Sequence, residues 1–305
     1  MSENTDLATL YSAIADSARL LDVPCARTNV WPILSAYGDS IAQAVVAFRV
    51  ATGARHKGEL DCRFTTTADV DPYALAVSNG FTAATDHPVG AVLADLAARC
   101  PVDSYGIDFG VVGGFKKIWA FFPPDDLQSL STLAEVPTMP RGLAENVGFF
   151  ARHGLDDRAN LVGVDYHHRT VNVYVGEPPS ACLTPDAIES MLRDIGMPAP
   201  SEGMLRLSQK AFGVYATFGW DSATIERITF AVMTQDPTTL PVQLEPKIER
   251  FVRGAPHAED GADRKFVYAV SSAPDGEYYK LQSYYQFRPR ILDRMRLANP
   301  AAELV

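Results

Sequence analysis

The chain has 305 residues and a mass of 33.2 kDa; 47% of the residues are hydrophobic and 21% are charged. This composition is typical of a globular protein and excludes a disordered chain, a collagen and a coiled coil. With 27 Lys and Arg against 37 Asp and Glu, the formal net charge is −10. The surface as a whole therefore repels nucleic acid and acidic membranes, so any anionic ligand needs a local basic cluster.

Features of location and redox state point to the cytoplasm. No run approaches the roughly 18 to 20 apolar residues that a membrane helix needs, and the acidic, amphipathic start MSENTDLATLYSAIADSARLL is unlike a signal peptide. The adjacent His167 and His168 would point to opposite faces of a strand, which argues against a zinc site. The four cysteines are far apart and are expected to be buried free thiols: Cys25, Cys62, Cys100 and Cys182.

Five pairs of alternating, strand-like runs recur along the chain about every 55 residues, and a short polar turn joins the two members of each pair. We predict β-hairpins at 45–50 with 60–65, 105–112 with 115–122, 161–166 with 170–175, 210–218 with 225–233, and 265–272 with 277–287.

Helix-like segments lie between these hairpins. Thr184-Pro185-Asp186 combines an N-cap, a proline in the first turn and an acid near the helix start, and Asp125-Asp126 is also interpreted as a helix cap. The predicted helices are 4–22, parts of 72–99 and of 125–153, 184–195, 244–253, and one near 289–298. Since no linker or low-complexity segment divides the chain, we predict one domain over residues 1–305.

Ten antiparallel strands with interleaved helices bury their apolar faces if the sheet closes and the helices wrap it. We therefore predict an α+β fold, a ten-stranded antiparallel β-barrel surrounded by helices. Ten strands leave a wider lumen than the eight-stranded barrel whose interior side chains nearly fill. The barrel is thus expected to hold a ligand.

Alternate strand residues share a face, and one face of each predicted strand is apolar, as in Val46, Phe48 and Val50. The other face mixes cations with Tyr, Trp, Asn or Gln, and its members are Ala47 and Arg49; Lys117, Trp119 and Phe121; Asn172 and Tyr174; Gly213, Tyr215 and Thr217; Arg227, Thr229, Ala231 and Met233; and Lys280, Gln282, Tyr284 and Gln286. This second face is either a solvated exterior or the wall of a cationic, aromatic-lined lumen. The excess of basic over acidic residues favours a lumen for a ligand that is anionic at one end and apolar or aromatic at the other.

Several motifs are absent from the sequence. No P-loop, GxSxG or HExxH occurs, and GVVGGF at 110–115 lies at a predicted hairpin turn, where it does not match a dinucleotide-binding fingerprint. Asp125-Asp126 is followed by Leu127-Gln128-Ser129, so the DDxxD spacing of helical terpene synthases is missing as well.

A set of short strings, taken in order, resembles the ABBA-type aromatic prenyltransferases, most closely the naphthol and phenazine branch. The strings are ELD (59–61), GGFKK (113–117), WAFFP (119–123), DY (165–166), VNVY (171–174) and EYYKL (277–281). The resemblance extends from the amino terminus to about residue 287. It implies a ten-stranded barrel built from repeated α-β-β-α units, the PT barrel, with its site in the lumen.

The resemblance also implies a reaction, transfer of a prenyl group from an allylic diphosphate to a carbon of an electron-rich aromatic ring. Cations and neutral donors would stabilise the departing diphosphate, and an aromatic chamber would protect the allylic cation. Positions that match the family's diphosphate site are Arg49, Lys117, His168, Asn172, Tyr174, Tyr215, Arg227 and Lys280. Positions that match its acceptor and prenyl pocket are Asp61, Trp119, Phe121, Asn160, Leu161, Gly213, Ala231, Met233 and Tyr284.

Three positions depart from the pattern of related types. Trp119 replaces a tyrosine and His168 replaces a lysine. Asp61 matches a magnesium ligand of metal-dependent members, but Arg49 stands where those members have a small hydroxyl residue. A guanidinium there can neutralise phosphate and pair with Asp61. We therefore predict that no cofactor is required and that Mg²⁺ is dispensable; Asp61 would be the ligand if the enzyme used the metal.

The leading hypothesis is a cytoplasmic, monomeric enzyme that transfers a dimethylallyl or geranyl group to a hydroxynaphthalene, flaviolin or dihydrophenazine carboxylate. Its partners would be the prenyl diphosphate and the small aromatic acceptor, with no nucleic acid or membrane. The alternative is a non-catalytic barrel that carries small aromatic anions. A terpene cyclase or chain-elongating synthase is a third option, but the sequence lacks the aspartate-rich motifs and the all-helical pattern of those enzymes.

Overall fold

In a computed structural model of the chain, the described residues are 6–41, 44–258 and 264–286. All ten predicted strands are present. They are β1 (Val46–Ala51), β2 (Asp61–Thr67), β3 (Ser104–Gly110), β4 (Gly114–Phe121), β5 (Ala159–Asp165), β6 (Thr170–Gly176), β7 (Gly213–Gly219), β8 (Arg227–Thr234), β9 (Phe266–Ala273) and β10 (Gly276–Gln286).

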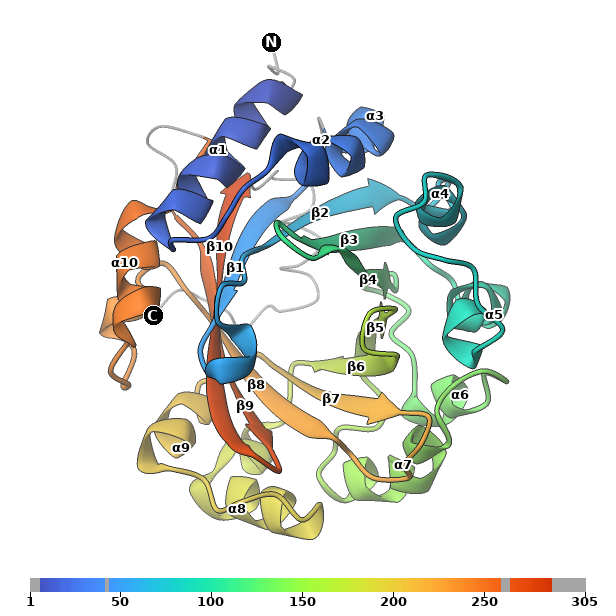
Figure 1. Cartoon of the computed structure of the whole chain (residues 1–305). Helices are drawn as coiled ribbons and strands as arrows, with labels where there is room; N and C mark the ends of the chain where they lie inside the picture. Colours follow the sequence, from blue (N-terminus) through green and yellow to red (C-terminus); the bar gives the residue numbers. More distant parts are fainter. Residues whose placement is uncertain (1–5, 42–43, 259–263, 287–305) are drawn as a thin grey trace.

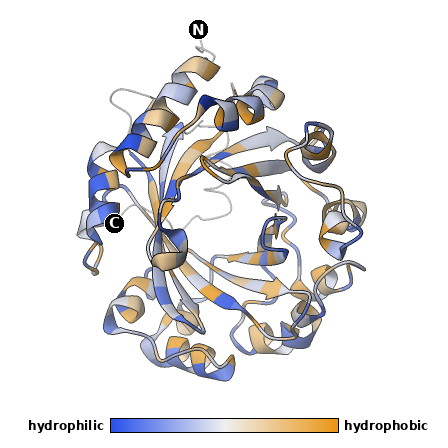
Figure 2. Ribbon diagram, viewed as in Figure 1, coloured by the Kyte–Doolittle hydropathy of each residue, from blue (hydrophilic) through white to orange (hydrophobic). Residues whose placement is uncertain are grey.

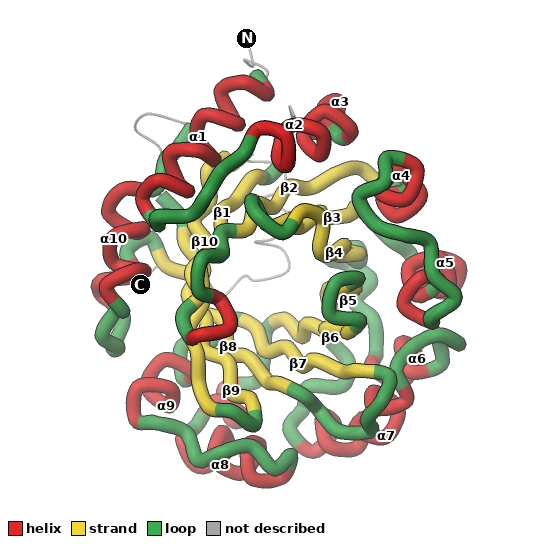
Figure 3. Tube along the Cα trace, viewed as in Figure 1, coloured by secondary structure: helices red, strands yellow, loops and turns green. Residues whose placement is uncertain are grey.

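The ten strands form a closed antiparallel barrel in the order β1-β10-β9-β8-β7-β6-β5-β4-β3-β2. Each strand pairs with its neighbour in sequence, and the pairing of β1 with β10 closes the sheet. Figures 1 and 3 show the strands as an inner ring with the helices outside it. The predicted α+β barrel, wrapped by helices, is confirmed.

The helices of the described residues lie before the first hairpin or between successive hairpins. They are α1 (Leu7–Leu20), α2 (Arg27–Ala36), α3 (Gly38–Ile41), α4 (Pro72–Ser78), α5 (Val92–Arg99), α6 (Leu130–Ala134), α7 (Arg141–Arg152), α8 (Pro185–Asp194), α9 (Glu202–Ser208) and α10 (Pro246–Gly254). No helix among these residues is long and apolar enough to cross a membrane.

The hydrophobic core lies between the barrel wall and the helices. Outward strand residues such as Phe48, Phe230 and Leu281 are fully buried against helical residues such as Leu10 and Ile188. Burying each of these large side chains contributes about 1.5–3 kcal/mol to folding. The helices therefore carry both hydrophobic and hydrophilic residues (Figure 2), and the opposite face of each strand is left to line the lumen.

Three β-bulges change the strict alternation of faces. The register shifts between Asp108 and Phe109 on β3, which leaves Lys116 as the extra residue of β4. A second shift between Ala159 and Leu161 makes Asn160 the extra residue of β5. A third lies between Val46 and Ala47, opposite Tyr285 of β10.

The β10 bulge corrects one prediction from the strand alternation. Gln286 was predicted to share the lumenal face with Tyr284, but it pairs with the outward-facing Val46, while Tyr284 pairs with Ala47. Tyr285, the extra residue, reverses the alternation after Tyr284. The Gln286 amide consequently donates to the backbone oxygen of Ala44 at 2.8 Å, away from the cavity.

Other local predictions were wrong or incomplete. Asp125-Asp126 caps no helix, since α6 begins at Leu130 and its cap is Ser129, whose hydroxyl accepts from the amide of Thr132 at 3.1 Å. All four cysteines are free, and three are buried, but Cys25 is half-buried. The helix predicted near 289–298 lies outside the described residues.

Three helices were not predicted: α2, the short α3 and α9. Helix α2 contains Pro32, an unusual residue inside a helix, yet it forms because Val30, Ile33 and Leu34 are buried against the barrel. Helix α9 follows the cap Ser201, whose hydroxyl accepts from the amide of Met204, so its sequence did carry a capping signal.

Candidate active site

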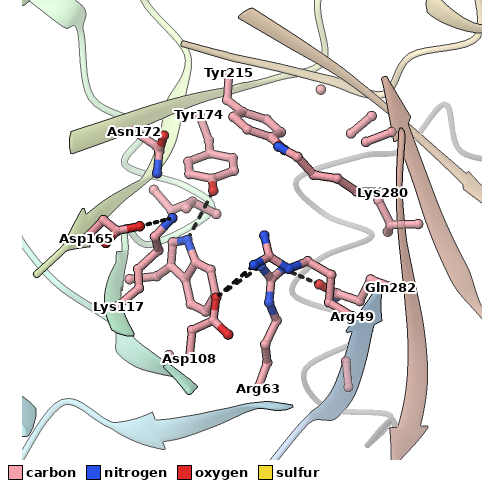
Figure 4. A pocket seen from close by; sticks show the side chains of 18 of the residues that line it. Arg49, Arg63, Asp108, Lys117, Asp165, Asn172, Tyr174, Tyr215, Lys280 and Gln282 are labelled. Atoms are coloured by element: carbon pink, nitrogen blue, oxygen red, sulfur yellow. Dashed lines mark hydrogen bonds and ion pairs between the residues drawn. The ribbon is translucent and has the colours of Figure 1, made fainter. Parts of the chain in front are cut away.

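A cavity of about 260 Å³ lies inside the barrel, and inward side chains of the strands line it. Figure 4 shows the polar part of this wall, with side chains from opposite sides of the barrel converging on one space. The sequence-predicted site residues that line it are Arg49, Lys117, Trp119, Phe121, Asn160, Leu161, His168, Asn172, Tyr174, Gly213, Tyr215, Arg227, Ala231, Met233, Lys280 and Tyr284.

Cross-strand register explains why residues distant in sequence meet here. One row runs from Gly106 on β3 through Trp119, Gly163, Asn172 and Thr217 to Arg227 on β8, each residue paired with the next. Residues directly opposite on antiparallel strands share a face and lie close together. A second row joins Leu161, Tyr174, Tyr215, Thr229 and Ser271 in the same way.

Two of the bulges add residues to the wall. Because Lys116 is the extra residue of β4, both it and Lys117 line the cavity. Asn160 and Leu161 face inward together for the same reason. Lys116 was not predicted, since strict alternation places it on the outer face with Ile118; a bulge next to the Gly113-Gly114 turn is the signal that was missed.

Asp61 does not line the cavity, which corrects its predicted place in the acceptor pocket. Its carboxylate shares the lumenal face with its strand partner Arg49, but it is buried and accepts hydrogen bonds from Arg49 and, at 2.8 Å, from Lys116. Burial alone would raise the pKa of Asp61, but these two cations lower it below its usual value. Lys116 also lies 3.4 Å from Glu59. The predicted pairing of Arg49 with Asp61 is present.

A second ion pair joins two lumenal residues that the sequence analysis did not select. Arg63 donates to Asp108 at 3.2 Å and to the side chain of Gln282, and its guanidinium lies 4.5 Å from the centre of the Trp119 ring. Figure 4 shows Arg63 between Asp108 and Gln282. The alternation of Asp61, Arg63 and Thr65 against Cys62 and Phe64 was the available signal for Arg63.

Lys117 and His168 meet at Asp165. The lysine ammonium lies 3.3 Å from the carboxylate, which also contacts the imidazole Nδ1 of His168 at 3.3 Å. Burial opposes ionisation of Asp165, but Lys117 and His168 hold its pKa below the usual value. The His168 side chain is 52% exposed, so this predicted site residue lies at the cavity mouth.

Two cations of the wall, Arg227 and Lys280, have no carboxylate within 4 Å among the described residues. The Lys280 ammonium donates to the Tyr215 hydroxyl at 3.0 Å and lies 5.1 Å from the Tyr215 ring centre. Arg227 donates to Thr217 at 3.3 Å, and Thr217 donates to Asn172. Burial first, and then the nearby arginines and Lys117, hold the pKa of Lys280 well below the usual value.

The lining therefore carries more positive than negative charge, and the unpaired part lies beside hydroxyl and amide groups. A polyanion such as a diphosphate would stabilise these buried cations and receive hydrogen bonds from them. The remaining wall is aromatic or apolar. Trp119, Phe121, Tyr174 and Tyr284 lie on it with the small or flexible Gly213, Ala231, Met233, Val267 and Ala269. The site can thus hold a ligand that is anionic at one end and hydrocarbon-like at the other.

Comparison with known proteins identifies the family. The profile of the family described as aromatic prenyltransferase Orf2 matches residues 5–293. The chain belongs to this aromatic prenyltransferase family. It is 52% identical over 288 residues to the flaviolin linalyltransferase of Streptomyces virginiae, with 94% of this chain and 95% of that protein covered.

Two further members of the aromatic prenyltransferase family are equally informative. The 5,10-dihydrophenazine-1-carboxylate 9-dimethylallyltransferase of Streptomyces anulatus is 50% identical, with 95% of this chain and 97% of that protein covered. The furaquinocin biosynthesis prenyltransferase of Streptomyces sp. (strain KO-3988) is 49% identical, covering 97% and 95%. The predicted resemblance to the naphthol and phenazine branch is confirmed, and the protein is an aromatic prenyltransferase.

Solved structures agree on the fold. The prenyltransferase PriB in its apo form has a TM-score of 0.55 at 13% identity, with 92% of this chain and 96% of that chain covered. A 6-dimethylallyl tryptophan synthase has the same TM-score at 12% identity, covering 93% and 97%. The barrel and the family set aside the non-catalytic carrier and the all-helical synthase.

Proposed function

We propose that this prenyltransferase transfers a dimethylallyl or geranyl group from its diphosphate to a ring carbon of an electron-rich aromatic acceptor. The acceptor is a hydroxynaphthalene such as flaviolin, or a dihydrophenazine carboxylate. The observation that carries the proposal is a pair of cavity-lining cations, the buried Lys280 and the half-buried Arg227. Neither has a carboxylate partner among the described residues, and both lie next to an aromatic chamber. The names of two Streptomyces relatives support this choice of donors and acceptors: one names flaviolin and a linalyl group, and the other names 5,10-dihydrophenazine-1-carboxylate and a dimethylallyl group.

The proposed diphosphate site consists of the polar wall residues. Lys280 and Arg227 supply positive charge, Tyr174, Tyr215 and Asn172 supply neutral donors, and Arg49, Lys117 and His168 complete the set. When the bond between the allylic carbon and the diphosphate oxygen breaks, negative charge grows on the leaving group. Fixed donors in a buried site stabilise that charge more than water does, which lowers the barrier.

The proposed chamber for the allylic cation and the acceptor is the aromatic and apolar wall. The faces of Tyr174 and Tyr215 stabilise a cation through their electron density. The barrel and its helices exclude water, so the acceptor ring reaches the cation first. Phe121, Leu161, Gly213, Ala231, Met233 and Tyr284 define the space in which the acceptor and the prenyl chain meet.

We propose that turnover needs no divalent metal. Mg²⁺ is bound through free carboxylate oxygens, usually one or two, together with substrate phosphate. Both oxygens of Asp61 are already bonded, one to Arg49 and the other to Lys116. No group of three or more His, Cys, Asp or Glu suited to a metal occurs within the described part of the chain. The residues therefore do not fit a magnesium site at Asp61, and Arg49 carries the positive charge there.

The proposed partners are the prenyl diphosphate and the acceptor alone, and the proposed location is the cytoplasm. The acidic net charge of −10 disfavours binding to nucleic acid. The four free cysteines are consistent with a reducing compartment.

The test is product formation by the purified protein. Dimethylallyl and geranyl diphosphate are each offered with 1,3-dihydroxynaphthalene, flaviolin or dihydrophenazine-1-carboxylate, with Mg²⁺ or with EDTA. We expect a prenylated product that persists in EDTA. Consumption of neither donor with any acceptor would contradict the proposed substrates, and loss of turnover in EDTA with recovery on Mg²⁺ would contradict metal independence.

A matched pair of lysine variants tests the site. We expect Lys280→Met to lower kcat/KM about 10- to 100-fold, the usual cost of losing a hydrogen bond from a charged donor. The control is Lys210→Met, which removes an exposed lysine that does not line the cavity. Equal activity of the two variants would contradict the diphosphate site.

A further inference from the structure

Two glycines flank Trp119 in the cross-strand row described above. Gly106 on β3 and Gly163 on β5 are its direct partners on either side. Neither glycine has a positive φ, so neither is required by the backbone conformation. Glycine weakens the interior of a strand, and it often marks a close approach of another group. A close contact in the space beside each glycine therefore explains why glycine stands there.

The indole of Trp119 occupies that space. A Cβ atom built on Gly163 would lie 2.7 Å from both Cδ1 and Nε1 of Trp119, and one built on Gly106 would lie 3.0 Å from Cε3. Contacts this short force a side chain to move, and here the atoms belong to a rigid ring. The two glycines thus form a slot that lets the indole lie flat against the barrel wall. Arg63 covers the ring, 4.5 Å from its centre.

The slot sets the direction of the indole N–H. Trp119 Nε1 donates to the hydroxyl oxygen of Tyr174 at 3.2 Å (Figure 4). An indole nitrogen can only donate, so the tyrosine oxygen accepts this bond and its own hydrogen is directed elsewhere. Among the described residues, Trp119 is the only side chain hydrogen-bonded to this hydroxyl. The Tyr174 proton remains available to a ligand.

The hydroxyl of the neighbouring Tyr215 also accepts a hydrogen bond from a side chain that can only donate. The rings of Tyr174 and Tyr215 stack with centres 4.3 Å apart, and the Tyr215 oxygen accepts a bond from Lys280 at 3.0 Å. A lysine ammonium also only donates. Each hydroxyl therefore accepts from a fixed donor, and hydrogen bonds that run in one direction strengthen one another.

We propose that Gly106, Gly163 and Trp119 are positioning residues that fix the Tyr174 hydroxyl as a hydrogen-bond donor to the diphosphate. This inference rests on the proposed function. It assigns Trp119 an effect at the diphosphate end of the cavity in addition to its place in the acceptor wall. The two glycines fix the position of the indole, and the indole N–H bonds to the Tyr174 oxygen. The Tyr174 O–H then donates its hydrogen bond to the anion.

The test measures the affinity of the protein for inorganic pyrophosphate by calorimetry, without acceptor. Trp119→Phe keeps an aromatic ring but removes the N–H, and we expect a loss of affinity of about 3- to 10-fold, typical of one neutral hydrogen bond. Gly163→Ala keeps both bonded groups but displaces the indole, so we expect a loss in the same range. Gly148→Ala, on the exposed side of α7 with no atom within 4 Å of the added Cβ, is the control and should bind as the wild type does.

A double-mutant cycle separates this role from a simple wall contact. Trp119→Phe combined with Tyr174→Phe should bind pyrophosphate no more weakly than Tyr174→Phe alone, because the two residues act through one bond. Thermal unfolding of each variant checks that it is folded. If Gly163→Ala does not fold, Trp119→Phe and Tyr174→Phe still test the proposed bond.

Unchanged affinity in Trp119→Phe, or additive losses in the cycle, would overturn the inference while leaving the proposed function intact. Failure of the wild type itself to bind pyrophosphate would overturn the proposed function, and the inference with it.

Discussion

At the residue scale, the cations of the site differ in whether a carboxylate compensates their charge. Arg49 and Lys116 share Asp61, and Arg63 is paired with Asp108, so these cations are held in place by the protein. Within the described part of the chain, Lys280 contacts only the hydroxyl and ring of Tyr215 and the ring of Tyr278 through its ammonium group. A bound anion stabilises most strongly the cation whose charge is least compensated by the protein. We therefore expect anion binding to change the protonation of Lys280 more than that of any other residue in the site.

The affinity for pyrophosphate is predicted to depend on pH through Lys280. Burial and the nearby cations lower its pKa in the free protein, while a bound anion favours the charged form. Between these two pKa values binding takes up a proton, so affinity falls as pH rises, over a range that begins below the usual lysine value. In Lys280→Arg the guanidinium stays charged, and this part of the pH dependence should vanish. Calorimetry measures the pyrophosphate affinity of both proteins over a pH series. If the affinity of the two proteins changed with pH in the same way, the prediction would be contradicted.

At the scale of elements, alternation and capping were reliable where the chain kept a regular period and failed at irregularities. The ten strands were all predicted, because each carries an alternating run between turn residues. Single bulges nevertheless moved Lys116 into the lumen and Gln286 out of it. A bulge adds one unpaired residue at a point decided by the neighbouring strand, so the alternation of one strand cannot locate it.

The start of α6 gives a test of capping. Ser129→Ala is expected to lower the free energy of unfolding by about 1 kcal/mol, because it removes the acceptor for the amide of Thr132. Asp125→Ala should change it by less than about 0.5 kcal/mol, as is usual for an exposed residue that caps nothing. Urea denaturation of both variants makes the comparison. A larger loss in the aspartate variant would restore Asp125 as the cap.

At the scale of the whole molecule, closure of the barrel removes the free strand edges through which sheets associate. Val112 is the only exposed large hydrophobic side chain recorded for the described residues. The acidic surface also opposes self-association. The molecule thus keeps its apolar surface between barrel and helices, and its uncompensated positive charge inside the lumen.

We therefore predict a monomer in solution. Light scattering coupled to size-exclusion chromatography should give a mass near 33.2 kDa. The mass should not rise with protein concentration, because residues 6–41, 44–258 and 264–286 offer neither a free strand edge nor a broad apolar patch for pairing. A stable mass of twice that value would contradict the prediction.

The sequence by itself determined the ten strands, the closed barrel and most of the lumenal side chains, because strand alternation is a local property that reports which face is buried. Resemblance to a family added the roles of residues such as Asn172 and Arg227. Apart from the Arg49–Asp61 pair, which was predicted from the sequence, the tertiary structure decided which cations are paired and which are free, since pairing depends on register between strands. Asp61 is buried by its bonds to Arg49 and Lys116, and the Trp119 indole lies between two glycines; both placements come from contacts between different strands.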